Sequence, residues 1–281
     1  MTGNDQFIKP PPLAPSRFYD SPGRCIYCPE DAHTNILGDE HIIPEALGGT
    51  FVLRRASCKK HEGITSRAER FVLRDLLIQA RTHLKLPTKR PKNRPTEFPV
   101  TVVVDDDTQR QMLVPADDCP ITLGLLAFVN PRIFLDLPPD DSHPTGPAPL
   151  QSWFCVWYPK PGMSGGNYFG GKGHVADLKL GWGQFAKMLA KIGHAFATAE
   201  LGHGNFRPLL LDIIHAPDGQ FFGFSHLIGG ECQPVAPGTE LHEISLITHR
   251  TPKGQMLHVV RVRLFSYLGA PIYYAVAGTA V

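Results

Sequence analysis

The chain has 281 residues, of which 42% are hydrophobic, so it is long enough for one large domain or two ordinary ones with a packed core. Its formal net charge of +2 is too small to indicate a nucleic-acid partner from composition alone, so such a partner must be argued from local patches. The sequence has no apolar run of about 18 residues, and proline stands where a secretion signal would have its apolar region. These features exclude a membrane-spanning segment and favour a cytoplasmic location.

Residues 1–20 are rich in proline and offer little to bury, which predicts a flexible arm. Residues 21–85 then hold the short cysteine and histidine motifs that could bind a metal ion. Three of the six cysteines, Cys25, Cys28 and Cys58, lie close together near the start of the chain, whereas the other three are isolated. In a reducing compartment, a closely spaced pair of cysteines indicates a zinc or redox site in preference to a disulfide.

Two short motifs have the same spacing. Cys25 and Cys28 are separated by two residues, and so are Cys58 and His61. Such spacing lets both side chains of each motif reach one ion, and together they complete the tetrahedral Cys₃His sphere of a structural zinc. The alternative is a redox or chance cysteine pair beside a surface histidine. The 29 residues between Cys28 and Cys58 exceed a simple zinc ribbon, so an inserted element is expected between the motifs.

The inserted element contains the stretch LGDEHIIPEALGG, residues 37–49. With its flanking Cys-x2-Cys and Cys-x2-His motifs and the helix that follows them, this stretch resembles the HNH endonucleases of the ββα-metal superfamily. The similarity is greatest to the zinc-containing branch that includes phage junction resolvases, and it covers about Cys25 to Glu69. It implies a ββα fold and metal-dependent hydrolysis of phosphodiester bonds.

The resemblance implies that His41 is the general base and that Glu40 and Glu62 bind a catalytic Mg²⁺ or Mn²⁺. The chemistry agrees, because an imidazole titrates near neutrality and carboxylates are suitable ligands for such ions. Ile42 and Ile43 are expected to anchor a β segment in the core, while a proline and a double glycine reverse the chain behind them.

Several assignments within this site stay open. Alternation along a regular strand would place Asp39, in preference to Glu40, on the same face as His41. Glu62 stands where many HNH proteins have asparagine or histidine, and it either binds the ion or caps the following helix. Glu69 lies on the same helix face as Glu62 and is a third candidate ligand.

A helix is predicted from Thr65 to about Leu84 from the spacing of its apolar residues. Its other side is basic and predicts contacts with nucleic-acid phosphates, for which the candidates are Arg67, Arg70 and Arg74. Residues 86–98 are rich in proline and in basic residues, so they predict an extended linker at a domain boundary.

Residues 99–281 predict an α+β domain dominated by an antiparallel sheet, so the fold class of the whole chain is α+β. One amphipathic helix is predicted from about Trp182 to Leu201. The three isolated cysteines of this region are expected to be small buried residues. The expected strands lie at residues 99–107, 109–115, 152–158, 209–214, 219–228, 241–249, 258–269 and 271–278.

The sequence therefore favours an HNH-type endonuclease with a structural zinc and a catalytic Mg²⁺ or Mn²⁺. Nucleic acid is the expected partner, with DNA as the expected substrate, and no membrane is involved. The C-terminal domain is a place for a protein partner or for self-association. Two alternatives are a catalytically degenerate zinc module that binds DNA and a zinc-braced module for protein interaction.

Overall fold

A computed structural model of the chain describes residues 9–29, 36–103, 108–119, 121–140, 153–158, 167–168, 171–175, 181–217, 223–231 and 235–281. It has the predicted α+β fold, in which α-helices combine with mostly antiparallel sheets. Among the described residues, none of the helices has the length and apolar character needed to cross a membrane.

The N-terminal part contains a three-stranded sheet of order β1-β3-β2, followed by a helix. Its elements are β1 (Arg17–Tyr19), β2 (Leu37–His41), the short 3-10 helix η1 (Glu45–Leu47), β3 (Phe51–Cys58) and α2 (Lys59–Phe71). Strand β2 is antiparallel to β3, and β1 is parallel to β3, so the last residues of the predicted arm belong to the sheet. The hairpin β2–β3 and α2 follow one another in ββα order.

The predicted helix over residues 65–84 is wrong in its bounds. Helix α2 begins earlier, directly after Cys58, and it is followed by a π-helical turn η2 (Val72–Leu76) and a short helix α3 (Ile78–His83). The wider turn adds one residue to the period, and Leu76 and Leu77 at its end are both buried in the core. Apolar spacing alone did not reveal this interruption.

The segment after α3 contains a 3-10 turn, η3 (Pro91–Asn93), and leads into a small four-stranded sheet of order β5-β4-β9-β8. Its strands are β4 (Glu97–Val103), β5 (Gln109–Pro115), β8 (Asn167–Tyr168) and β9 (Gly171–Val175). Strands β6 (Ile121–Leu126) and β7 (Trp153–Tyr158) form a separate antiparallel pair. The predicted strands in residues 99–103, 109–115 and 153–158 are therefore confirmed.

The C-terminal sheet has the order β10-β14-β13-β12, and β11 also pairs with β14. All of its neighbouring strands are antiparallel. The strands are β10 (Phe206–Pro208), β11 (Ile228–Gly230), β12 (His242–Arg250), β13 (Met256–Leu264) and β14 (Tyr273–Ala280).

Two predicted strands of this region are helical instead. The short helix α5 (Leu211–His215) replaces most of the strand expected at 209–214, and α6 (Phe224–Leu227) replaces the described part of the one at 219–228 before β11 begins. A short run of apolar residues is equally compatible with a buried strand and with a buried helical turn. The sequence pattern of these two segments therefore could not distinguish a strand from a helix. Two further 3-10 turns are η5 (Arg132–Leu135) and η6 (Ser266–Leu268).

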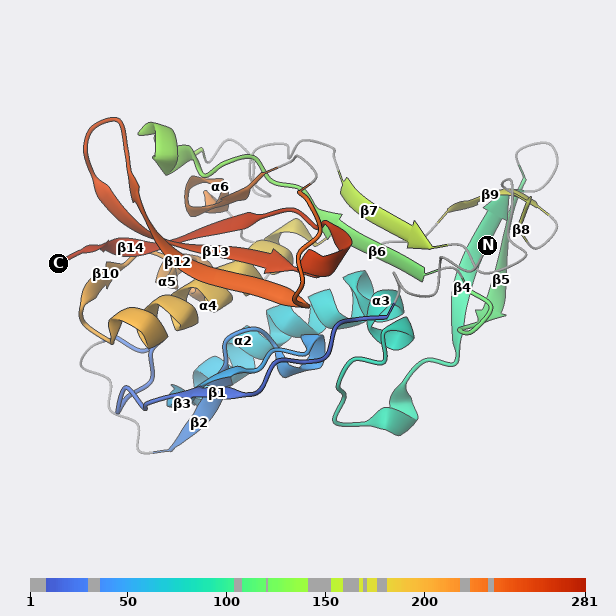
Figure 1. Ribbon diagram of the computed structural model, residues 1–281, viewed down its shortest axis with the longest axis horizontal. Helices are drawn as coiled ribbons and strands as arrows, with labels where there is room; N and C mark the ends of the chain where they lie inside the picture. Colours follow the sequence, from blue (N-terminus) through green and yellow to red (C-terminus); the bar gives the residue numbers. More distant parts are fainter. Residues whose placement is uncertain are drawn as a thin grey trace.

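Helix α4 (Trp182–Leu201), predicted with these bounds, lies between the C-terminal sheet and the layer formed by α2 and strands β1–β3 (Figure 1). It is buried on all sides over most of its length. At Gly193 a Cβ atom would lie 2.5 Å from the Cβ of Ala275, so glycine lets the helix approach β14 closely. This central helix provides side chains to both neighbouring layers.

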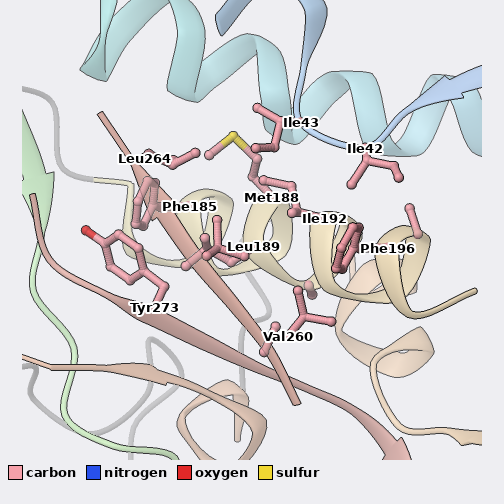
Figure 2. Close-up of a cluster of buried hydrophobic side chains, with 14 of the residues drawn as sticks. Ile42, Ile43, Phe185, Met188, Leu189, Ile192, Phe196, Val260, Leu264 and Tyr273 are labelled. Carbon is pink, nitrogen blue, oxygen red and sulfur yellow. The ribbon is translucent and has the colours of Figure 1, made fainter. Parts of the chain in front are cut away.

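The two isoleucines of the opening stretch anchor the N-terminal layer, as predicted. Ile42 and Ile43 are 0% and 5% exposed, and Figure 2 shows them on one side of α4, with Val260 and Tyr273 on the other. One continuous cluster of buried apolar side chains joins the N-terminal layer, α4 and the C-terminal sheet. A small separate cluster lies between β4 and β5. Whether residues 86–98 separate independently folding domains stays a prediction.

Candidate metal centre and cationic groove

Cys25, Cys28, Cys58 and His61 come together in one buried cluster, in which one ligand atom of each lies within 4.8 Å of all the others. The Sγ atoms of Cys28 and Cys58 are 3.8 Å apart, and Nδ1 of His61 lies 3.6, 3.4 and 3.2 Å from the three sulfur atoms. Tetrahedral zinc with Zn–S bonds of about 2.3 Å places two sulfur atoms about 3.8 Å apart. The cluster thus has the size and the donor set of a structural zinc site.

Local structure positions these four ligands. Cys58 ends β3 and is the N-cap residue of α2, so His61 follows it on the first turn of that helix. The other two cysteines lie in the loop before β2, where the backbone N–H of Ile26 donates to the carbonyl oxygen of Ala56 on β3. Both motifs are therefore fixed to the same strand.

Burial shifts the pKa of each ligand in the cluster. Burial raises the pKa of Cys28 to about 12 and also raises the pKa of Cys25. Burial acts in the same direction on Cys58, but hydrogen bonds from the backbone N–H of His61 and from neighbouring thiols outweigh it and lower the pKa of Cys58. Burial, with the nearby charges of His215 and Lys60, lowers the pKa of His61 to about 4, so its imidazole is neutral, as a metal ligand must be.

A second group of residues surrounds the metal cluster. Tyr27, between the first two ligands, is fully buried, and its ring centroid lies 5.6 Å from that of His194 on α4. Nε2 of His194 donates to the carbonyl oxygen of Ile26 at 2.8 Å. The ring of His215, on α5, lies 5.0 Å from that of His61. Helices α4 and α5 thus brace the metal-binding loop from outside the N-terminal layer.

The β2–β3 ladder has a register shift between Gly38 and Glu40, and the side chains of Asp39 and Glu40 have different environments on either side of the strand. The exposed carboxylate of Asp39 accepts a hydrogen bond from the backbone N–H of Arg55, which has a φ of 47°. Asp39 therefore stabilises the irregular part of the hairpin, whereas Glu40 points inward and is 7% exposed. The irregularity lies before Glu40, because Glu40 and His41 pair in regular succession with Leu53 and Val52 at the end of the strand. A bend that would bring the side chains of Glu40 and His41 into one site is thus not found between them.

Glu40 is held by a lysine that the sequence analysis did not consider. Nζ of Lys191, on α4, lies 2.6 Å from Oε1 of Glu40 and 2.9 Å from Oε1 of Glu69. The same ammonium donates to the carbonyl oxygens of His41 and Ile42. The Lys191 side chain is only 3% exposed, so this is a buried ionic cluster.

The other two predicted catalytic residues lie differently. The side chain of His41 is half-buried, and its buried Nδ1 has no hydrogen-bond partner within the described ranges. The side chain of Glu62 is 60% exposed and forms an ion pair of 3.0 Å with Lys59 on the same helix. Glu62 thus lies in the first turn of α2, where a carboxylate also stabilises the helix.

The predicted donors Glu40, His41 and Glu62 do not form a second metal-binding group. Among the residues that the structure describes, the Cys₃His cluster is the only set of three or more such side chains close enough to share an ion. The cation that Glu40 contacts is the ammonium of Lys191. The residues present thus fit a structural zinc, which the four ligands would hold, but they do not fit a catalytic divalent ion at Glu40.

A groove of about 870 Å³ lies beside the ionic cluster and shares Glu69 with it. One wall is the helical segment from Ser66 to Thr82, and the other is the segment from Leu86 to Pro95. Six basic side chains line it: Arg70, Arg74, Arg81, Lys89, Arg90 and Arg94.

The π-helical turn explains the position of Arg81. The backbone N–H of Leu77 donates to Val72 instead of Leu73, and the carbonyl oxygen left over at Leu73 accepts from the guanidinium of Arg81 at 2.9 Å. Arg94 in turn donates to the carbonyl oxygens of Arg81, Thr82 and Leu86 at the end of α3. Both arginines are thus fixed in the groove by neutral carbonyl oxygens, which do not themselves offset the positive charge.

The groove carries excess positive charge. No ion pair with a carboxylate joins Arg70, Arg74 or Arg90 within the part of the chain that the structure describes, and Lys89 lies 3.9 Å from Glu45. Burial, with the charges of Arg94 and Arg74, lowers the pKa of Arg81. An anion bound among these side chains would relieve that repulsion. Of the predicted phosphate contacts, Arg70 and Arg74 line the groove, whereas the exposed Arg67 does not.

Comparison of the chain with protein-family models, with curated proteins and with solved structures gave no match.

Proposed function

We propose that the chain is a zinc-stabilised module that binds nucleic acid through the cationic groove. The main evidence for this proposal is that six basic side chains line the groove. Three of them, Arg70, Arg74 and Arg90, form no ion pair with a carboxylate among the described residues. Guanidinium groups bind phosphate oxygens in pairs of hydrogen bonds, so such a surface suits a phosphate backbone. Contacts of this kind hold the backbone without reading the bases.

The zinc site supports this proposal by fixing one wall of the groove. Helix α2, which carries Arg70 and the ligand His61, begins directly after Cys58, and a zinc ion would tie this end of the helix to Cys25 and Cys28 in the loop before β2. The opposite wall is attached through Arg94, which donates to the end of α3. A rigid groove loses less entropy when it binds a ligand than one whose walls must first become ordered.

Hydrolysis of phosphodiester bonds is a second candidate function. It is favoured by the ββα order of β2, β3 and α2 around the zinc ligands and by the position of His41 at the end of β2. The ion pair between Glu40 and Lys191 opposes it, because this carboxylate already has a cation. Binding without cleavage is therefore the function that the geometry supports better.

Fluorescence anisotropy tests the binding proposal with labelled duplex DNA, single-stranded DNA and RNA of equal length. The double variant Arg70→Gln and Arg74→Gln should weaken binding by tenfold or more, because two phosphate contacts are lost. The matched control is Arg207→Gln, which removes an exposed arginine of β10 outside the groove. Equal loss of affinity in both variants, or no binding by the wild-type chain, would refute the proposal.

A cleavage assay on the same substrates with Mg²⁺, Mn²⁺ or EDTA separates the two candidates. We expect no cleavage by the wild-type chain under any of the three conditions. Metal-dependent cleavage that is lost in His41→Ala would establish hydrolysis instead and assign His41 a role in it.

A further inference from the structure

Four oxygen atoms surround the ammonium of Lys191 between α4, α2 and the end of β2. Two belong to the carboxylates of Glu40 and Glu69, at 2.6 and 2.9 Å. Two are carbonyl oxygens at the end of β2 and just after it, those of His41 and Ile42, the second at 3.3 Å. The ammonium comes from α4, a helix far away in the sequence, and it is shielded from water.

Such an arrangement is a complete cation site. Carboxylate and carbonyl oxygens are the donors that hard cations such as Mg²⁺ and Mn²⁺ prefer. Two carboxylates that contact one group repel each other, and the ammonium between them offsets that repulsion. The two carboxylates outweigh the effect of burial and raise the pKa of Lys191, which keeps the ammonium charged.

We propose that the ammonium of Lys191 permanently occupies the cation position beside β2 and α2, so that the wild-type chain binds no divalent ion there. The positive charge that Glu40 and Glu69 require then comes from Lys191 of α4. It is present whether or not metal ions are available. This inference concerns cation binding alone, so it stands or falls independently of nucleic-acid binding.

The proposal makes a specific prediction for a chain without this ammonium. Lys191→Ala leaves two carboxylates and two carbonyl oxygens around the space that the lysine side chain had filled. A divalent ion carries the two charges that would neutralise both carboxylates. The variant should therefore gain a site for a divalent ion that the wild-type chain lacks.

The experiment titrates Mn²⁺ into zinc-loaded wild-type chain, Lys191→Ala and the control Lys187→Ala, with detection of free Mn²⁺ by electron paramagnetic resonance. Lys187 is a suitable control because it is a buried lysine on the same helix whose ammonium donates to the carbonyl oxygen of Ala216. We expect Lys191→Ala to take up one equivalent of Mn²⁺ and to show a higher Tm when Mn²⁺ is added. The wild-type chain and Lys187→Ala should show neither effect.

Two results would overturn the proposal. One is stoichiometric uptake of Mn²⁺ by the wild-type chain that disappears in Glu40→Gln, because the site would then be open despite the lysine. The other is folded Lys191→Ala that binds no Mn²⁺ at millimolar concentration. If Lys191→Ala fails to fold with and without Mn²⁺, the titration of the wild-type chain decides: uptake that depends on Glu40 refutes the proposal, and lack of uptake supports it.

Discussion

We expect the chain to lose stability in acid because the imidazole of His194 is buried. The size of this loss follows from the pKa shift of His194. His194 is 3% exposed, and Nε2 donates to the carbonyl oxygen of Ile26 beside the zinc ligands. Burial, with smaller contributions from His203 and His215, lowers the pKa of His194 from 6.5 to about 4, although the hydrogen bond to Ile26 opposes the shift. The folded chain therefore takes up this proton at a lower pH than the unfolded chain does.

The sign and the magnitude follow from linkage. Because the folded pKa is lowered, the contribution of His194 to stability is complete above pH 6.5 and is lost as the pH falls from 6.5 towards 4. Each pKa unit corresponds to about 1.4 kcal/mol. Between pH 7.5 and pH 5.0, protonation of the unfolded chain at this one residue lowers the free energy of unfolding by about 2 kcal/mol.

The perturbation that isolates this effect is His194→Gln, since glutamine retains an N–H donor for Ile26 but does not titrate. Urea unfolding at both pH values gives the free energy of unfolding of the zinc-loaded wild-type chain and of the variant. The change with pH in the difference between these two free energies contains only the contribution of His194, because the contributions of all other titrating groups cancel. We expect the stability advantage of the wild-type chain over the variant to shrink by about 2 kcal/mol at pH 5.0. An advantage that is equal at the two pH values would refute the reasoning.

Two further pairs of variants test the zinc site and the hairpin. Cys58→Ser should reduce bound zinc, measured by mass spectrometry, from one equivalent to a small fraction, whereas Cys119→Ser, which changes a buried cysteine outside the cluster, should retain it. Equal zinc content in the two variants would contradict the ligand assignment. In Gly49→Ala the new Cβ would lie 2.0 Å from the carbonyl oxygen of Ile43, so calorimetry should show a fall in Tm corresponding to several kcal/mol. Gly63→Ala, on the open surface of α2, should instead raise the stability by about 1 kcal/mol, and a loss there would contradict the helix assignment.

The sequence predicted those parts of the molecule that depend on local patterns. The four residues of the Cys₃His cluster were found from spacing, because two residues between ligands allow both side chains of each motif to reach one ion. Helix α4 was found with its bounds, because its apolar stripe is long and Gly202 follows it. Ile42 and Ile43 were recognised as anchors from their position before a proline and a double glycine.

The parts that the sequence did not reveal depend on contacts between distant segments. Lys191 is 151 residues from Glu40 along the chain, and no local pattern marks a lysine on a mostly apolar helix as the partner of a carboxylate. Its one visible signal is that Lys187 and Lys191, four residues apart, interrupt a helix of mostly apolar residues. The helix break at η2 was hidden because Leu76 and Leu77 fit a regular helix and a π-helical turn equally well.

The salt dependence of nucleic-acid binding tests the central claim most directly. Four exposed basic side chains line the groove (Arg70, Arg74, Lys89 and Arg90), so a plot of log K against log salt for duplex DNA should have a slope of about −3 to −4. The double variant Arg70→Gln and Arg74→Gln should reduce the magnitude of that slope by about 2. A slope near zero for the wild-type chain, or one that the double variant leaves unchanged, would contradict a phosphate-binding groove.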